Sequence, residues 1–307
     1  MECVLCKSSL LTTVKVYTGH NPIFSGAEIC QCVECGMQMV SPLPTQKKWD
    51  SYNKSYFLNA HGGLNTSSWV ETFNVAIAKI RFNALKKFLV DRNLKLNSIL
   101  EVGPGPGYLM CQLKREYPNL KYFVVETDAS VHSRLQDNGA ILVEATTLPK
   151  KEKVDAIIAS HVVEHTLDPI GFLTHFTSML RRGGAVFVET PCLDHRYKNI
   201  YEPHVLFFNK NTLGKLLERC NLSQIKLTYN GDKIPSLRRN SFLRKCAVKF
   251  ELKTGAPCHK FLGKYWAMNK QLGLTYDEAM AIVETSPHVE QDVPARWVRG
   301  FGIKEND

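Results

Sequence analysis

The chain has 307 residues, of which 44% are hydrophobic, and a formal net charge of +10 at pH 7. This length and composition exclude an intrinsically disordered protein and leave room for one large core and a small second module. No apolar run approaches the roughly 20 residues that cross a bilayer, and no apolar stretch follows a basic N-terminal segment. We therefore expect a cytoplasmic protein without a membrane span. The positive charge admits an anionic partner, but it is also an ordinary means of staying in solution.

Two C-x-x-C pairs stand near the N-terminus. Cys3 and Cys6 form the first pair, and Cys32 and Cys35 form the second, with 25 residues between them. Four thiolates in two such pairs are typical of a closed structural Zn²⁺ site, and the lack of an export signal favours reduced thiols over disulfides. We predict a zinc-ribbon-like module over residues 1–45, which ends in the proline-containing segment 41–45.

The rest of the chain alternates between two periodicities. Apolar residues over 70–90 recur at helical spacing and predict an amphipathic helix. Beyond it, helical stretches separate strand-like runs at 98–102, 121–126, 154–159, 185–190 and 224–229. Such alternation predicts parallel strands joined by right-handed helical crossovers. The expected fold class is α/β, with a doubly wound, Rossmann-like, mostly parallel seven-stranded sheet.

We place the second domain at residues 46–307, with its core at about 96–232. Basic residues crowd the stretch of about 233–293, which we interpret as a helical insertion or lid, although a solvated basic face is an equal alternative. A final strand is expected at about 294–304.

A glycine-rich segment follows the first strand of the core. Gly103, Gly105 and Gly107 precede a helical pattern, as in loops where a ligand lies against the backbone at the carboxyl end of a strand. A dinucleotide fingerprint would need its third glycine at position 108, which is Tyr108, so the spacing argues against NAD. Glu126 ends the second strand, where such folds place an acid that accepts hydrogen bonds from ribose hydroxyls.

Five segments at compatible spacing carry a family resemblance. They are ILEVGPGPG (99–107), VVETD (124–128), VDAIIASHVVEHTLDP (154–169), LRRGGAVFVETP (180–191) and EPHVLFFNKNTLGKLLERCNL (202–222). Together they resemble the class I S-adenosylmethionine-dependent methyltransferases over roughly residues 70–230, and within them the ubiquinone-biosynthesis-like O-methyltransferases and sugar methyltransferases.

The resemblance implies S-adenosylmethionine as the cofactor and a set of residues that bind it. Within that set, Glu126 would bind the ribose, and Ser160 and His161 would lie beside the sulfonium. The implied cofactor-binding residues are Glu101, Gly103, Pro104, Gly105, Gly107, Glu126, Thr127, Ser160 and His161.

An acceptor hydroxyl must lose a proton, and histidine is the usual side chain for that work. By the resemblance, Glu164, His165 and His204 face the acceptor, and we assign them as catalytic residues. Each histidine could instead form a structural hydrogen bond that shapes its loop. Some quinone O-methyltransferases of the resembled group bind a divalent metal near this pair, but His161 stands where they carry a second acid, which argues against metal assistance here.

These features predict methylation of a small polar acceptor, by resemblance the hydroxyl of a sugar, a phosphorylated or nucleotide-linked sugar, or a surface glycan. Two alternatives stay open. One is an RNA methyltransferase that uses the zinc ribbon and the basic segment, so that nucleic acid is the partner. The other is a non-catalytic regulatory protein that binds the cofactor without turnover.

Overall fold

The computed structural model describes residues 1–64, 68–144, 153–235 and 290–305. Its helices, short 3₁₀ turns (η) and strands are, in chain order, β1 (Leu11–Val16), η1 (Pro22–Phe24), β2 (Glu28–Cys32), β3 (Gln38–Ser41), α1 (Gln46–Asn53), α2 (Tyr56–His61), α3 (Ser68–Asp91), β4 (Ser98–Val102), α4 (Tyr108–Glu116), β5 (Lys121–Val125), η2 (Ala129–Val131), α5 (His132–Asp137), β6 (Ile141–Leu142), β7 (Val154–Ser160), η3 (Val163–His165), α6 (Pro169–Thr177), β8 (Leu180–Pro191), η4 (Asp194–Arg196), β9 (Leu206–Phe207), α7 (Lys210–Arg219), β10 (Leu222–Lys233), β11 (Glu290–Gln291) and β12 (Ala295–Lys304). Most of the predicted basic insertion lies outside the described residues.

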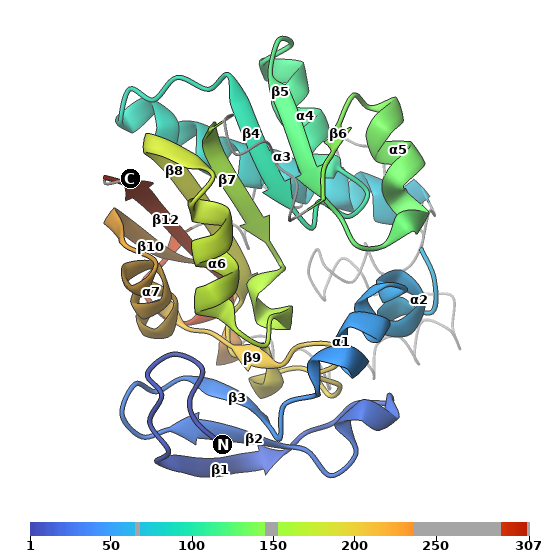
Figure 1. Ribbon diagram of the computed structural model, residues 1–307, viewed down its shortest axis with the longest axis vertical. Coiled ribbons are helices and arrows are strands. Elements are labelled where there is room, and N and C mark those ends of the chain that lie inside the picture. The colour runs from blue at the N-terminus through green and yellow to red at the C-terminus, as the bar shows by residue number, and fades with distance from the viewer. Residues whose placement is uncertain (65–67, 145–152, 236–289, 306–307) are drawn as a thin grey trace, which may run out of the picture.

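An eight-stranded sheet forms the centre of the molecule (Figure 1). Its order is β11-β10-β12-β8-β7-β4-β5-β6. The five strands from β8 to β6 run parallel, whereas β12 lies antiparallel between β8 and β10. The predicted α/β class and the final strand are confirmed. The sheet has one strand more than expected because the two-residue β11 pairs with the edge of β10.

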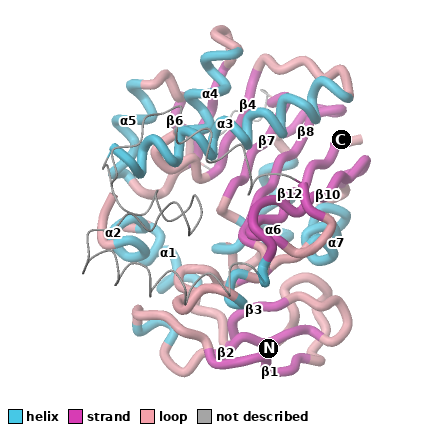
Figure 2. Tube along the Cα trace, turned by 180° about the vertical axis from the view of Figure 1, so that it is seen from behind, coloured by secondary structure: helices cyan, strands magenta, loops and turns pink. Residues whose placement is uncertain are grey.

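Alternate residues of the parallel strands pack into two separate hydrophobic cores, one on each face of the sheet. Ile99 packs with apolar residues of α3, α4 and α5 on one face, and Leu100 packs with those of α6 and α7 on the other. This follows from the two-residue period of a strand, which sends neighbouring side chains to opposite faces. In Figure 1, α6 and α7 lie in front of the sheet, and Figure 2 shows α3 across its rear face.

The N-terminal residues build a second sheet, of order β1-β2-β3-β9. Its fourth strand comes from far along the chain, because Met39 of β3 pairs with Leu206 of β9. Buried residues of the module, among them Met37 and Met39, belong to the same apolar cluster as Leu100 of the large sheet. The cysteine-bearing module therefore shares the core on the α6–α7 side of the large sheet, lies below that sheet in Figure 1, and contacts α7 through hydrogen bonds from Asn211 and Lys215 to the carbonyl of Cys35.

Within the described part of the chain, no helix combines the length and the apolar character that a membrane span requires.

Candidate active site

The glycine loop leaves β4 in the left-handed backbone region. Gly103, Gly105 and Gly107 have φ values of 63°, 53° and 79°. A Cβ atom on Gly103 would lie 2.7 Å from a methyl group of Val162, so both the dihedral angle and the space require glycine. The loop therefore exposes backbone, rather than side chains, at the carboxyl end of the sheet.

Glu126 closes this loop from the end of β5. Its Oε2 accepts the amide of Gly105 at 3.1 Å, and its Oε1 accepts the amide of Asp128 at 3.0 Å. Burial raises the pKa of this carboxyl group, and the two backbone amides lower it in part. Glu126 is thus held beside the glycine backbone, where a ribose could bind.

A cavity of about 470 Å³ opens at this edge of the sheet. Helix α1 and the 161–168 loop wall it opposite the glycine loop. Five predicted cofactor residues line it: Gly103, Gly105, Glu126, Thr127 and His161. A second cavity, of about 620 Å³, is lined by Pro104, Ser160 and His161 among others. The predicted set is thus gathered at one place, with His161 between the two cavities.

Two predicted cofactor residues lie apart from both cavities. Gly107 is the N-cap of α4 and shapes the loop. Glu101 is buried within the sheet, where its carboxylate accepts the hydroxyl of Tyr122 at 2.7 Å. Burial raises the pKa of Glu101 to about 7. The sequence motif alone does not reveal that Glu101 is buried against Tyr122, because the motif does not show on which face of the sheet the ligand binds.

The 161–165 loop carries three of the predicted residues. Glu164 is 1% exposed, and neither of its carboxylate oxygens accepts a hydrogen bond from the described residues. Burial alone would raise its pKa, but His161, 3.4 Å away, and His165 lower it to about 2. The carboxylate is therefore ionised and lacks the hydrogen bonds that a buried charge normally has.

His165 lines the first cavity, and its tautomer follows from its partner. Its Nδ1 lies 3.3 Å from the carbonyl of Pro203, so Nδ1 carries the proton and Nε2 carries a lone pair. Burial lowers the pKa of His165 to about 3 despite the nearby Glu164. His165 is thus neutral at physiological pH and presents the lone pair of Nε2 to the cavity as a hydrogen-bond acceptor.

His204 lies directly behind His165, with ring centroids 4.9 Å apart. Its Nδ1 is 2.6 Å from Oδ2 of Asp194, a carboxylate that is 1% exposed. His204 and Lys198 hold the pKa of Asp194 far below its usual range despite burial. Sequence reasoning did not find Asp194. Its one signal is an acid just past the carboxyl end of β8.

The described residues also offer a candidate cation site. Glu164, His165 and His204 each present one ligand atom, and these atoms lie within 4.8 Å of one another. Two imidazoles and a carboxylate are a donor set that divalent metals accept. His204 therefore supplies the third donor that His161 does not, and the presence of His161 in place of an acid does not exclude a divalent metal.

Buried charges fix the other side of the loop. Glu189, at the end of β8, is fully buried and accepts Arg81 Nε at 2.6 Å and also Arg299 Nε of β12. Its Oε1 lies 3.3 Å from Nε2 of His161. These charges hold the pKa of Glu189 well below its usual range despite burial. The network ties α3, the last strand and the loop into one unit.

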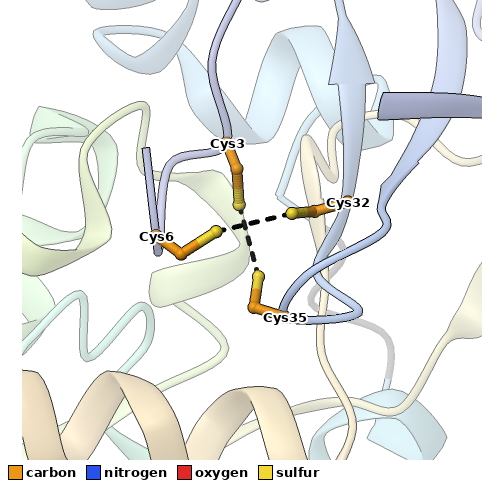
Figure 3. A group of neighbouring side chains, drawn as sticks. All are labelled: Cys3, Cys6, Cys32 and Cys35. Carbon is orange, nitrogen blue, oxygen red and sulfur yellow. Dashed lines mark hydrogen bonds between the residues drawn. The ribbon is translucent and has the colours of Figure 1, made fainter. Parts of the chain in front are cut away.

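The four predicted cysteines of the module meet at one point (Figure 3). The Sγ atoms of Cys3 and Cys35 are 3.4 Å apart, as are those of Cys6 and Cys32. Burial would raise the pKa of the Cys32 thiol, but the amides of Cys35 and Glu34 and the neighbouring Cys6 thiol lower it to about 7. Four converging sulfurs with amide support fit a tetrahedral Zn²⁺ ion.

The chain is similar to known methyltransferases. Residues 76–227 match a family model described as a methyltransferase domain. The chain is 31% identical over 162 residues to a tRNA U34 carboxymethyltransferase of Campylobacter fetus subsp. fetus, which covers 49% of this chain and 53% of the relative. It is 32% identical over 148 residues to the tRNA U34 carboxymethyltransferase of Campylobacter curvus, covering 45% of this chain and 46% of the relative.

The chain thus spans about half the length of the curated relatives that it matches. Among solved structures, the plantazolicin methyltransferase BpumL in complex with S-adenosylhomocysteine (SAH) superimposes with a TM-score of 0.50 at 10% identity, over 85% of this chain and 99% of that one. This likeness supports the fold.

Proposed function

Since this chain belongs to the class I S-adenosylmethionine-dependent methyltransferases, we propose that it methylates an RNA, with the acceptor group bound beside His165. One observation carries the proposal of catalysis: the cavity that meets the glycine loop and Glu126 is also lined by a neutral histidine, which the His204–Asp194 pair supports from behind. A protein that only bound the cofactor would not need this arrangement.

The residues at the cavity suit S-adenosylmethionine. Gly103 allows the closest approach to the backbone, and the Glu126 carboxylate can accept hydrogen bonds from a ribose. The cofactor supplies a methyl group on a sulfonium, so most of the acceleration can come from holding donor and acceptor at near-attack distance.

His165 and its neighbours would handle the acceptor proton. The lone pair on His165 Nε2 can accept a hydrogen bond from an acceptor hydroxyl and take its proton as the bond to the methyl group forms, when the hydroxyl becomes strongly acidic. Glu164 lies 3.9 Å from that nitrogen and would stabilise the imidazolium that forms. Asp194 keeps the proton of His204 on Nδ1 and so fixes the ring that packs against His165.

The relatives support RNA over the sugar acceptor that we first expected. Both are named for a tRNA substrate. The distribution of charge agrees, because residues 233–270 hold ten Lys and Arg against one Glu. Such a charge density favours binding to a phosphate backbone. An RNA acceptor and reduced cysteines also fit a cytoplasmic enzyme with a structural zinc ion on Cys3, Cys6, Cys32 and Cys35.

The test is transfer of label from S-adenosylmethionine that carries a radioactive methyl group. Unmodified tRNA transcripts, total RNA and a panel of nucleotide sugars would be offered separately to the purified full chain. We expect label in RNA, with weaker incorporation as salt rises. Digestion to nucleosides and mass spectrometry would identify the modified base and the group added.

Two variants serve as controls. Glu126→Ala should lose cofactor binding, and His165→Ala should bind the cofactor but transfer little. Label that enters only the nucleotide sugars would refute the RNA acceptor. Full transfer by His165→Ala would refute the catalytic assignment.

A further inference from the structure

Two side chains from the first 53 residues reach the backbone of the two candidate catalytic histidines. The hydroxyl of Tyr17 donates to the carbonyl of His204 at 3.1 Å, and Nε1 of Trp49 donates to the carbonyl of His165 at 2.6 Å. Burial, with a contribution from nearby Glu202, raises the pKa of Tyr17 far above its usual value. The Tyr17 hydroxyl therefore stays protonated and remains a donor.

Both donors belong to one aromatic cluster, formed by Tyr17, Phe24, Trp49 and Tyr52. Ring centroids lie 4.7 Å apart between Tyr17 and Phe24, and 6.1 Å apart between Phe24 and Trp49. Trp49 stacks on Tyr52 at 5.2 Å with an interplanar angle of 6°. Because aromatic rings in such contact move little independently, a displacement of the module displaces both donors together.

The backbone of the module also holds the segment around His204. Tyr201 donates its amide to the carbonyl of Thr18 at 2.8 Å, and Val40 donates to the carbonyl of Val205 at 2.9 Å. Val205 in turn donates to the carbonyl of Glu164 at 2.9 Å. Main-chain contacts from the module thus flank His204 on both sides and continue to the 161–165 loop.

We infer that the cysteine module positions His204 through Tyr17, and positions His165 through the contact of Phe24 with Trp49 of α1, so that metal binding at the four cysteines determines whether the acceptor side of the active site is assembled. Tyr17 and Trp49 are positioning residues here, since they act on the histidines through backbone carbonyls. The inference rests on the proposed function, because it assigns a role within the same site.

The charge of the module favours this role over contact with RNA. Residues 1–45 hold two lysines and three glutamates, and four thiolates on a Zn²⁺ ion would add further negative charge. A surface of this sign repels phosphate. The electrostatics therefore point to an internal, structural use of the module, in contrast to the sequence-based alternative in which the ribbon binds RNA.

The experiment compares Tyr17→Phe with Tyr229→Phe in the zinc-loaded full chain. Tyr229 is buried to a similar degree, and its hydroxyl also bonds to backbone, but it accepts the amide of Lys210 rather than donating to a candidate catalytic histidine. Calorimetry would give the dissociation constant for S-adenosylmethionine, and ¹⁵N-histidine NMR would report the ring environments of His165 and His204. Neither measurement needs an acceptor, so both can be read even if RNA is not the substrate.

For Tyr17→Phe, we expect displaced His204 resonances with cofactor affinity changed less than ~2-fold, because Tyr17 lines neither cavity. Turnover should fall ~10- to 100-fold, the scale of a small misplacement of a catalytic group. Chelation of the zinc should shift the same resonances further, and Tyr229→Phe should leave them in place.

Unchanged His204 resonances in Tyr17→Phe, or in the chelated protein, would overturn the inference. So would a loss of cofactor affinity as large as the loss of turnover, since that would indicate general damage. Failure of RNA methylation with these histidine shifts intact would instead count against the proposed acceptor alone.

Discussion

Glu189→Gln should be among the most destabilising single substitutions in the molecule. Glu189 is fully buried and pairs with Arg299, which is 2% exposed, and with Arg81. A neutral amide would leave the Arg299 guanidinium buried without a counter-charge. Removing one partner of a buried ion pair costs about 3 to 5 kcal/mol, a large part of a typical folding free energy of ~5–15 kcal/mol.

Urea denaturation followed by circular dichroism would measure this loss, provided that the slope of the free energy of unfolding against urea concentration is the same in the variant and the wild type. Glu116→Gln is the matched control, because Glu116 pairs with Lys86 on the surface, where solvent screens the interaction. We expect the control to unfold almost like the wild type. A loss of less than ~1 kcal/mol in Glu189→Gln would contradict this prediction and show that the desolvated arginine had found another partner.

Three further predictions follow from the site. Gly103→Ala should weaken S-adenosylmethionine binding more than ~10-fold because its Cβ would meet a valine methyl at 2.7 Å, whereas Gly26→Ala, at a similar positive φ but in open space, should keep the wild-type affinity in calorimetry. Between pH 7 and pH 5 the unfolded chain protonates His165 near its ordinary pKa of 6.5, while the folded chain, in which the pKa is about 3, does not. The free energy of unfolding should therefore decrease as the pH is lowered, by up to ~2 kcal/mol more in the wild type than in His165→Asn. Equal decreases in the two proteins, measured by denaturation at pH 7 and pH 5, would contradict this. Asp194→Asn should lower the free energy of unfolding by ~1.5–3 kcal/mol and leave the cofactor affinity unchanged. It should also alter the tautomer of His204, which ¹⁵N NMR would detect, and an unaltered tautomer would show that Asp194 does not orient the ring.

The strands were predicted from local pattern alone, and the agreement is close. The run at 98–102 coincides with β4, and the run at 121–126 exceeds β5 by one residue. Strand β10 extends beyond the predicted 224–229 because both of its ends pair with β12, which returns from the end of the chain. Strand β8 begins before the predicted 185–190 because Leu180 pairs with Val154 of β7, and it ends later because Pro191 pairs with β12. Pairing with a distant strand lengthens an element in a way that its own residues do not signal.

In the candidate site, too, the part set by local sequence could be predicted and the part set by distant contacts could not. The glycine loop and Glu126 could be recognised because their spacing is set by a single strand–turn–helix unit. On the acceptor side, the resemblance alone indicated His165 and His204, and Asp194 could not be found, since His204 contacts Asp194 and His165 only after distant segments of the chain have come together. The preference for a sugar acceptor came from resemblance, and substrate identity depends on such details of a pocket rather than on fold.

The amino-acid sequence alone determined the α/β class, the cofactor loop and the two cysteine pairs, because period, glycine spacing and C-x-x-C knuckles are local properties of the chain. The folded protein alone shows that the module with these cysteines, together with α1, packs against the loops that carry the candidate catalytic histidines. That contact joins Tyr17 to His204 and Trp49 to His165, pairs that are 187 and 116 residues apart, and it depends on a shared apolar core that no local pattern encodes.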